Sequence, residues 1–135
     1  MKSLIAIPIL ILLVAAGCGS DDVTGPQKAW VATDPIQCLG NPWEQDWLEA
    51  HGGDYEAYPR DPSTPGLEPE EEEIITEYYD REHDVKIFDI ETAETYEGVC
   101  RACSCPQGYT LYLLIPTLDV ETMLDLGYTL EGPKR

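Results

Sequence analysis

Four cysteines constrain the fold of this chain more than any other feature of its sequence. Cys100, Cys103 and Cys105 crowd together directly ahead of an apolar run at residues 109–115, and Cys38 lies far upstream. An even set of cysteines in a small domain is typical of structural disulfides that form in an oxidising compartment. We therefore predict two disulfides within this set.

The N-terminal residues have the pattern of an export signal. Lys2 precedes an almost unbroken apolar run at residues 4–16. This run is too short to cross a bilayer as a helix, which needs about 20 residues, but it has the length of a signal-peptide core. The run is followed by Gly17 and by the fifth cysteine, Cys18.

The segment Val14-Ala15-Ala16-Gly17-Cys18 resembles the lipobox of bacterial lipoproteins, with Ala15 where that family usually has leucine. The resemblance covers only the N-terminal leader. It implies cleavage before Cys18, a diacylglycerol on its sulfur and an acylated amino terminus, and two or more acyl chains anchor a protein stably. Gly19 is not the aspartate that resembles an inner-membrane retention signal, which favours the outer membrane or the cell surface. The alternative is an ordinary secretory signal with Cys18 incidental.

We divide the chain into three parts on this basis. Residues 1–17 are the signal peptide, residues 18–28 are a flexible polar tether after the lipidated cysteine, and residues 29–135 form a single domain. The tether contains Gly25 and Pro26, which disfavour regular structure.

Acidic residues outnumber lysine and arginine by 26 to 8, which gives a formal net charge of −18 at pH 7. Removal of the leader would take away a single basic residue, Lys2, and no acidic one. Such a charge disfavours nucleic-acid binding and electrostatic attraction to anionic lipid, because phosphates would be repelled. Basic proteins and cations remain possible partners, and the simplest interpretation is a well-solvated exported surface.

Periodicity and turn signals predict an α+β domain. We expect strands at residues 29–33, 85–90 and 109–115, and a short edge strand at 128–130; residues 91–98 could extend the second strand or form a loop.

We expect one helix that starts at Pro42 behind an Asn41 cap and ends at His51, a second that runs from Pro69 to about His83, and a third that follows Pro116. In the third helix Val120, Met123 and Leu124 should face inward, and Gly127 should form its C-terminal cap.

This order of elements is that of a small ferredoxin-like (split βαβ) sandwich with an antiparallel sheet. The first and third strands are adjacent and central in that topology. The third predicted strand, at residues 109–115, is apolar on both faces, as a central strand should be.

The fold also ranks the three disulfide pairings. A bridge between Cys103 and Cys105 is disfavoured because so short a loop strains the bond. If the first and third strands pair antiparallel, Cys38 falls near Cys105, which leaves Cys100 to pair with Cys103, and we favour this pairing. The alternative, Cys38 with Cys103 and Cys100 with Cys105, is nearly as good.

Two other chemistries compete with structural disulfides. Cys100-x-x-Cys103 could be the redox pair of an envelope thiol-disulfide oxidoreductase, although no helix N-terminus is expected after Cys103 to lower a thiol pKa. Four thiolates, with Cys38 as the fourth, could instead hold zinc, although the C-x-C spacing is unusual for a zinc ribbon.

The remaining residues give no catalytic signature. His51 and His83 fall at predicted helix ends, where an imidazole complements the helix dipole. The sequence contains no H-E-x-x-H, no G-x-S-x-G and no glycine-rich phosphate loop. The glutamates at residues 70–73 lack the order of a tight calcium loop. The three tryptophans, Trp30, Trp43 and Trp47, fit core positions better than a ligand-binding face.

We therefore expect a non-enzymatic, exported lipoprotein, anchored to a membrane through its N-terminal lipid, with a small acidic domain that binds a protein partner in the envelope or supports the envelope. No cofactor and no nucleic-acid partner are expected. The alternatives are the oxidoreductase or metal-binding protein named above, and an acidic decoy or inhibitor of a basic protein.

Overall fold

The computed structural model describes residues 25–60, 66–95 and 98–134. The predicted signal peptide, Cys18 and most of the predicted tether lie outside these residues. Within them, no helix combines the length and the apolar character that crossing a membrane would require.

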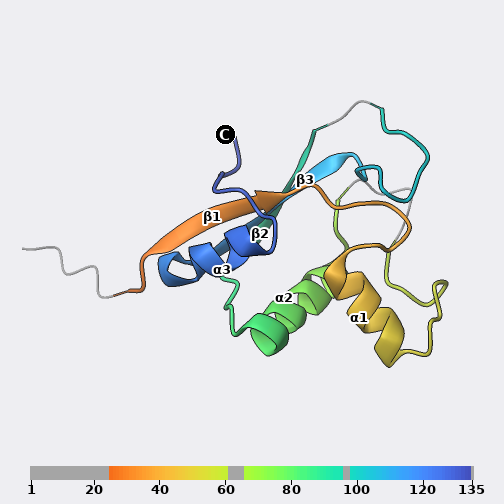
Figure 1. Ribbon diagram of the computed structural model, residues 1–135, viewed down its shortest axis with the longest axis horizontal. Coiled ribbons are helices and arrows are strands. Elements are labelled where there is room, and N and C mark those ends of the chain that lie inside the picture. The colour runs from red at the N-terminus through yellow and green to blue at the C-terminus, as the bar shows by residue number, and fades with distance from the viewer. Residues whose placement is uncertain (1–24, 61–65, 96–97, 135) are drawn as a thin grey trace, which may run out of the picture.

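The centre of the domain is an antiparallel sheet of three strands, β1 (Lys28–Thr33), β2 (Asp89–Glu94) and β3 (Tyr109–Pro116). The order is β1-β3-β2, and β3 runs antiparallel to both neighbours (Figure 1). β1 and β2 therefore run in the same direction on either side of β3. The predictions that the first and third strands pair and that the third is central are confirmed.

Both faces of β3 are largely buried. Tyr109, Leu111, Leu113 and Ile115 alternate along one face, and all four belong to the hydrophobic core. Val31 of β1 lies directly opposite Leu113 and joins this face, because directly opposed residues of antiparallel strands share a face. This run of alternate large apolar residues explains why β3 occupies the centre.

The helices α1 (Pro42–Ala50) and α2 (Pro69–His83) both lie in the connection between β1 and β2. Figure 1 shows them together on one side of the sheet, where Trp43, Ile75 and Tyr79 enter the core. After β3, a 3-10 turn (η1, Thr117–Asp119) leads into α3 (Val120–Asp125), which contributes Met123.

The ends of α1 follow the sequence signals. Asn41 has the extended backbone of an N-cap, Pro42 follows it, and the backbone N–H of Asn41 donates to the Glu44 carboxylate at 2.8 Å. At the other end, His51 Nδ1 lies 2.7 Å from the carbonyl oxygen of Trp47. The predicted start and end of this helix are confirmed.

The second strand begins later than predicted. β2 starts at Asp89 and continues through the polar residues to Glu94, whereas Val85 and Ile87 lie outside the sheet. Val85 and Ile87 are nevertheless buried, and the Val85 N–H donates to the carbonyl of Tyr79 at the end of α2. The β-branched residues therefore fill the core directly after the helix and do not pair as a strand.

The C-terminal region agrees with the sequence in part. Gly127 has a φ of +94°, and the following N–H of Tyr128 donates to Met123 O at 3.1 Å, so the predicted cap is confirmed. Leu124 is 41% exposed, and its predicted inward orientation is wrong, because a helix of six residues turns only one narrow side to the core. Thr129 pairs with Ala32 as an isolated antiparallel bridge, not as a strand.

Candidate functional site

The structure contains two disulfides, Cys38–Cys103 and Cys100–Cys105, with Cα atoms 5.0 and 5.7 Å apart. The prediction that these four cysteines form two disulfides is confirmed. The favoured pairing of Cys38 with Cys105 is wrong, and the alternative pairing is the one present. As a result, Cys100 and Cys103 are not bonded to each other.

The register of the two loops explains the pairing. Ile36 forms a bridge with Pro106, and the N–H of the next residue, Gln37, donates to Cys105 O at 2.9 Å. Gln37, rather than Cys38, therefore lies against Cys105. Cys38 has a φ of +61°, so the chain turns there, and its side chain bonds to Cys103 instead.

Side chains also join the loop of residues 34–41 to the loop of residues 99–108. The amide of Gln37 donates to Cys100 O at 2.7 Å and to Pro106 O at 3.0 Å. In the other direction, the N–H of Gln107 donates to Pro35 O at 2.7 Å. The two loops therefore form one cross-linked unit, which we call the braced end of the domain.

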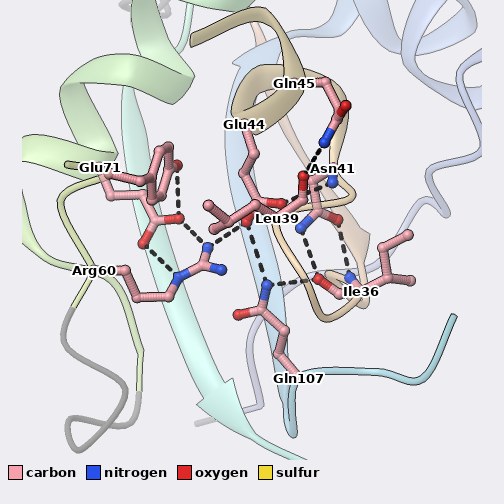
Figure 2. Close-up of polar contacts among 9 residues, drawn as sticks. Ile36, Leu39, Asn41, Glu44, Gln45, Arg60, Glu71 and Gln107 are labelled. Atoms are coloured by element: carbon pink, nitrogen blue, oxygen red, sulfur yellow. Dashed lines mark hydrogen bonds and ion pairs between the residues drawn. The ribbon is translucent and has the colours of Figure 1, made fainter. Parts of the chain in front are cut away.

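A cluster of buried charges lies beside the braced end (Figure 2). The side chains of Glu44 and Glu71 are fully buried, and Arg60 is 17% exposed. The guanidinium of Arg60 lies between the two carboxylates and contacts both through Nη2. The Tyr58 hydroxyl donates to Glu71 at 2.9 Å. We call these four residues the ionic cluster.

Glu44 connects the ionic cluster to the braced end. Its Oε2 accepts the Asn41 N–H at 2.8 Å, and its Oε1 accepts the side-chain amide of Gln107 at 3.3 Å. The same Gln107 amide donates to Ile36 O at 2.7 Å, and the Asn41 side chain clamps both backbone groups of Ile36 (Figure 2). A single polar network therefore runs from Arg60 to the loops that carry the disulfides.

The cluster buries two carboxylates against one guanidinium. Burial raises the pKa of the Glu71 carboxyl, and the charge of Arg60 opposes this rise. Burial and the charge of Glu71 raise the pKa of both Tyr58 and Tyr109, so both phenols stay protonated. Burial works against the charge of Arg60, but the two carboxylates outweigh it and raise the pKa of the guanidinium.

All four carboxylate oxygens of Glu44 and Glu71 have hydrogen-bond donors. A general base needs an oxygen that can reach a substrate proton, and a metal ligand needs a free lone pair directed at the ion. The arrangement is therefore typical of a structural ion cluster. Buried charges that are fully paired position the chain segments that carry them, here α1, α2 and the loop before Arg60.

Sequence reasoning identified these residues only in part. Glu71 was noted only as one of the four glutamates at residues 70–73, and neither Glu44 nor Arg60 was singled out as a site residue. The available signal was spacing, because Glu71 lies four residues before Ile75 and eight before Tyr79, on the buried stripe of α2. Glu44 likewise lies four residues before the buried Leu48.

Both histidines, Trp43 and Trp47 pack against other aromatic rings. Trp47 stacks on His51 with ring centres 3.8 Å apart. Trp43 is 1% exposed and lies in the core, and the ring centres of His83 and Tyr79 are 5.7 Å apart. Both histidines occupy helix ends, as predicted. Among the described residues, no group of three or more histidine, cysteine, aspartate or glutamate side chains is arranged to hold a metal ion.

Comparison with family models, with curated proteins and with solved structures found no match to this chain. What the chain does is therefore inferred from its residues and their geometry.

Proposed function

We propose that this chain is an exported bacterial lipoprotein, anchored to a membrane through a lipid on Cys18, whose acidic, disulfide-braced domain binds a protein partner in the cell envelope without catalysing a reaction. This proposal rests on one observation: two disulfides are present in the residues that follow an N-terminal export pattern. Disulfides persist in the compartments that exported proteins reach and are rare in the cytosol.

The exposure of the cysteines supports an oxidising location. Cys38, Cys100 and Cys103 are exposed, and only Cys105 is buried. Exposed disulfides are open to attack by thiolates, so they would not survive in a thiol-rich cytosol. The export pattern and the disulfide geometry therefore point to the same side of the membrane.

The chemistry of the polar residues supports a binding role. The two buried carboxylates are fully hydrogen-bonded, and the disulfides cross-link loops that also share backbone hydrogen bonds. Both arrangements favour a rigid domain over a reactive one.

For the fold, we propose a reduced ferredoxin-like sandwich. The bridge between Thr129 and Ala32 places the C-terminal segment beside β1, on the edge opposite to β3. A fourth strand of a split βαβ sheet belongs at that edge. On this proposal, the isolated bridge is the remnant of that strand.

The test of the anchor is the intact mass of the protein isolated from membranes, compared with that of a Cys18→Ser variant. We expect the wild type to begin at a lipid-modified Cys18, and the variant to accumulate as an uncleaved, unlipidated precursor. An unmodified Cys18 in the wild-type protein would overturn the proposal.

The rival function is a thiol-disulfide oxidoreductase. Cys100 and Cys103 are not bonded to each other, so the observation in its favour is the exposed bridge between Cys38 and Cys103. The two functions predict different numbers of free thiols in the exported protein. A structural role predicts no alkylatable thiol among these four cysteines in the exported protein, whereas a working oxidoreductase cycles through a reduced form with two.

A further inference from the structure

A groove of about 520 Å³ runs between the outer side of α2 and the start of β2. Ile87, Phe88 and Ile90 provide its apolar part, and Ile87 reaches the core beneath it. We call this feature the α2–β2 groove. Its lining includes no cysteine and no residue of the ionic cluster.

The polar lining of the α2–β2 groove is acidic. Glu72, Glu73 and Glu77 line it from α2, and Asp89 lines it from β2. No basic residue belongs to this lining, but Lys28 and Lys86 lie over the ring of Phe88, with Nζ 4.1 and 5.5 Å from its centre. All four carboxyl-bearing residues are exposed, and none forms an ion pair within the described parts of the chain. By contrast, Arg81 further along α2 is held by Asp46 and Glu82.

The groove borders an open sheet edge. β2 pairs with β3 on one side, and no strand of the described residues pairs with its other side. Ile90 lies opposite Leu113, on the sheet face that α2 covers, so the apolar part of the groove adjoins the backbone of this edge. An unpaired edge is a template for an added strand.

The carboxylates of the groove determine which kind of strand can bind there. A second copy of this chain would bring its own acidic β2, with Asp89, Glu91 and Glu94, against the same carboxylates. A lysine- or arginine-bearing strand would instead pair with these carboxylates and cover the apolar side chains. Charge complementarity of this kind selects partners and speeds association.

We propose that an extended basic segment of a partner protein adds as a strand to the free edge of β2, with apolar side chains in the α2–β2 groove and cationic side chains against its carboxylates. This inference rests on the partner-binding role proposed above and names the class of partner. It involves neither Cys18 nor the lipid.

The test uses the purified exported protein and a labelled ten-residue peptide that alternates lysine and valine. One variant, E73K/E77K, reverses two charges in the groove. A matched control, E49K/D125K, makes the same change in net charge at exposed positions outside it. We expect the groove variant to bind about tenfold more weakly or worse, and the control to bind almost as the wild type does.

Two further readouts address strand addition. Hydrogen exchange of the β2 amides, residues 89–94, should slow when the peptide is bound. A peptide that is N-methylated along one edge should bind much more weakly, because it cannot donate to the strand.

Equal weakening in both variants would overturn the proposal, because it would mean general attraction to an acidic protein. Binding without protection of β2, no detectable binding, or dimerisation through β2 would also overturn it. The anchor is tested separately: a lipid-modified Cys18 without peptide binding rejects the groove alone, and an unmodified Cys18 leaves a positive binding result in place.

Discussion

The two ends of this domain are stabilised by different interactions. At the sheet and helices, apolar side chains such as Leu111, Leu113 and Ile75 are fully buried, and their removal from water favours folding. At the braced end, several residues are exposed, and the loops are held by two disulfides and by a polar network centred on Glu44. The difference shows how a small domain can order long loops that have little apolar surface to bury.

The two ends also differ in how they respond to a change. Apolar packing loses free energy roughly in proportion to the surface that is removed, and the site can relax. A buried ion cluster loses more free energy of unfolding from a single substitution, because the loss of one partner leaves an uncompensated charge. The comparison therefore predicts that single polar substitutions beside the braced end destabilise as much as large core truncations do.

The largest effect is expected for Arg60→Met. This change removes the guanidinium that pairs with the buried carboxylates of Glu44 and Glu71 and keeps an unbranched stem in its place. We expect the free energy of unfolding to fall by about 3–5 kcal/mol, measured by urea denaturation. The control is Arg81→Met, because Arg81 is 52% exposed and its ion pairs should contribute less than about 1 kcal/mol. Equal losses in the two variants would show that burial does not increase the contribution of the ionic cluster to stability.

The next largest effect is expected for Cys38→Ser. Its disulfide closes a separation of 65 residues, and its loss should cost about 2–5 kcal/mol and leave Cys103 as a free thiol. Cys100→Ser opens a bridge with a separation of 5 residues and should be milder, since the chain-entropy cost of so short a loop is small. Melting of both variants and alkylation of the free thiol measure this difference. A larger loss in Cys100→Ser would contradict the assigned roles of the two bridges.

A smaller effect is expected from pH. The pKa of Glu71 is raised by burial in the folded state, so folding favours its protonated form. The resulting stability is fully present below the unfolded pKa and is lost as the pH rises through the folded one. Stability should therefore increase as the pH is lowered from 7 toward mildly acidic values, and Glu71→Gln should weaken this dependence. A pH profile of unfolding that is the same in both proteins would show that the general acidic charge, and not Glu71, is responsible.

The sequence was most informative where local rules act alone. The Asn41-Pro42 start of α1, the Gly127 cap and the central position of β3 each depend on a few neighbouring residues, and each was predicted. The start of β2 was misplaced, because burial of Val85 and Ile87 against α2 produces the same β-branched pattern as a strand does.

The candidate site depended on tertiary contacts, which local patterns do not contain. The set of paired cysteines was predicted from their number and the expected compartment. Their pairing required the register of Gln37 against Cys105 and the turn at Cys38, and neither is encoded by spacing alone. The ionic cluster required Arg60, in a loop with no periodic signal, to meet carboxylates from two helices.

The most direct test of the central claim is mass spectrometry of a non-reduced tryptic digest of the membrane-derived protein. Cleavage at Arg101 separates Cys100 from Cys103 and Cys105, and fragmentation between Cys103 and Cys105 then distinguishes the pairings. We predict a lipid-modified N-terminal peptide that begins at Cys18, with Cys38 linked to Cys103 and Cys100 linked to Cys105. An unmodified Cys18, or four alkylatable thiols at the other positions, would contradict the account of an exported, disulfide-braced lipoprotein.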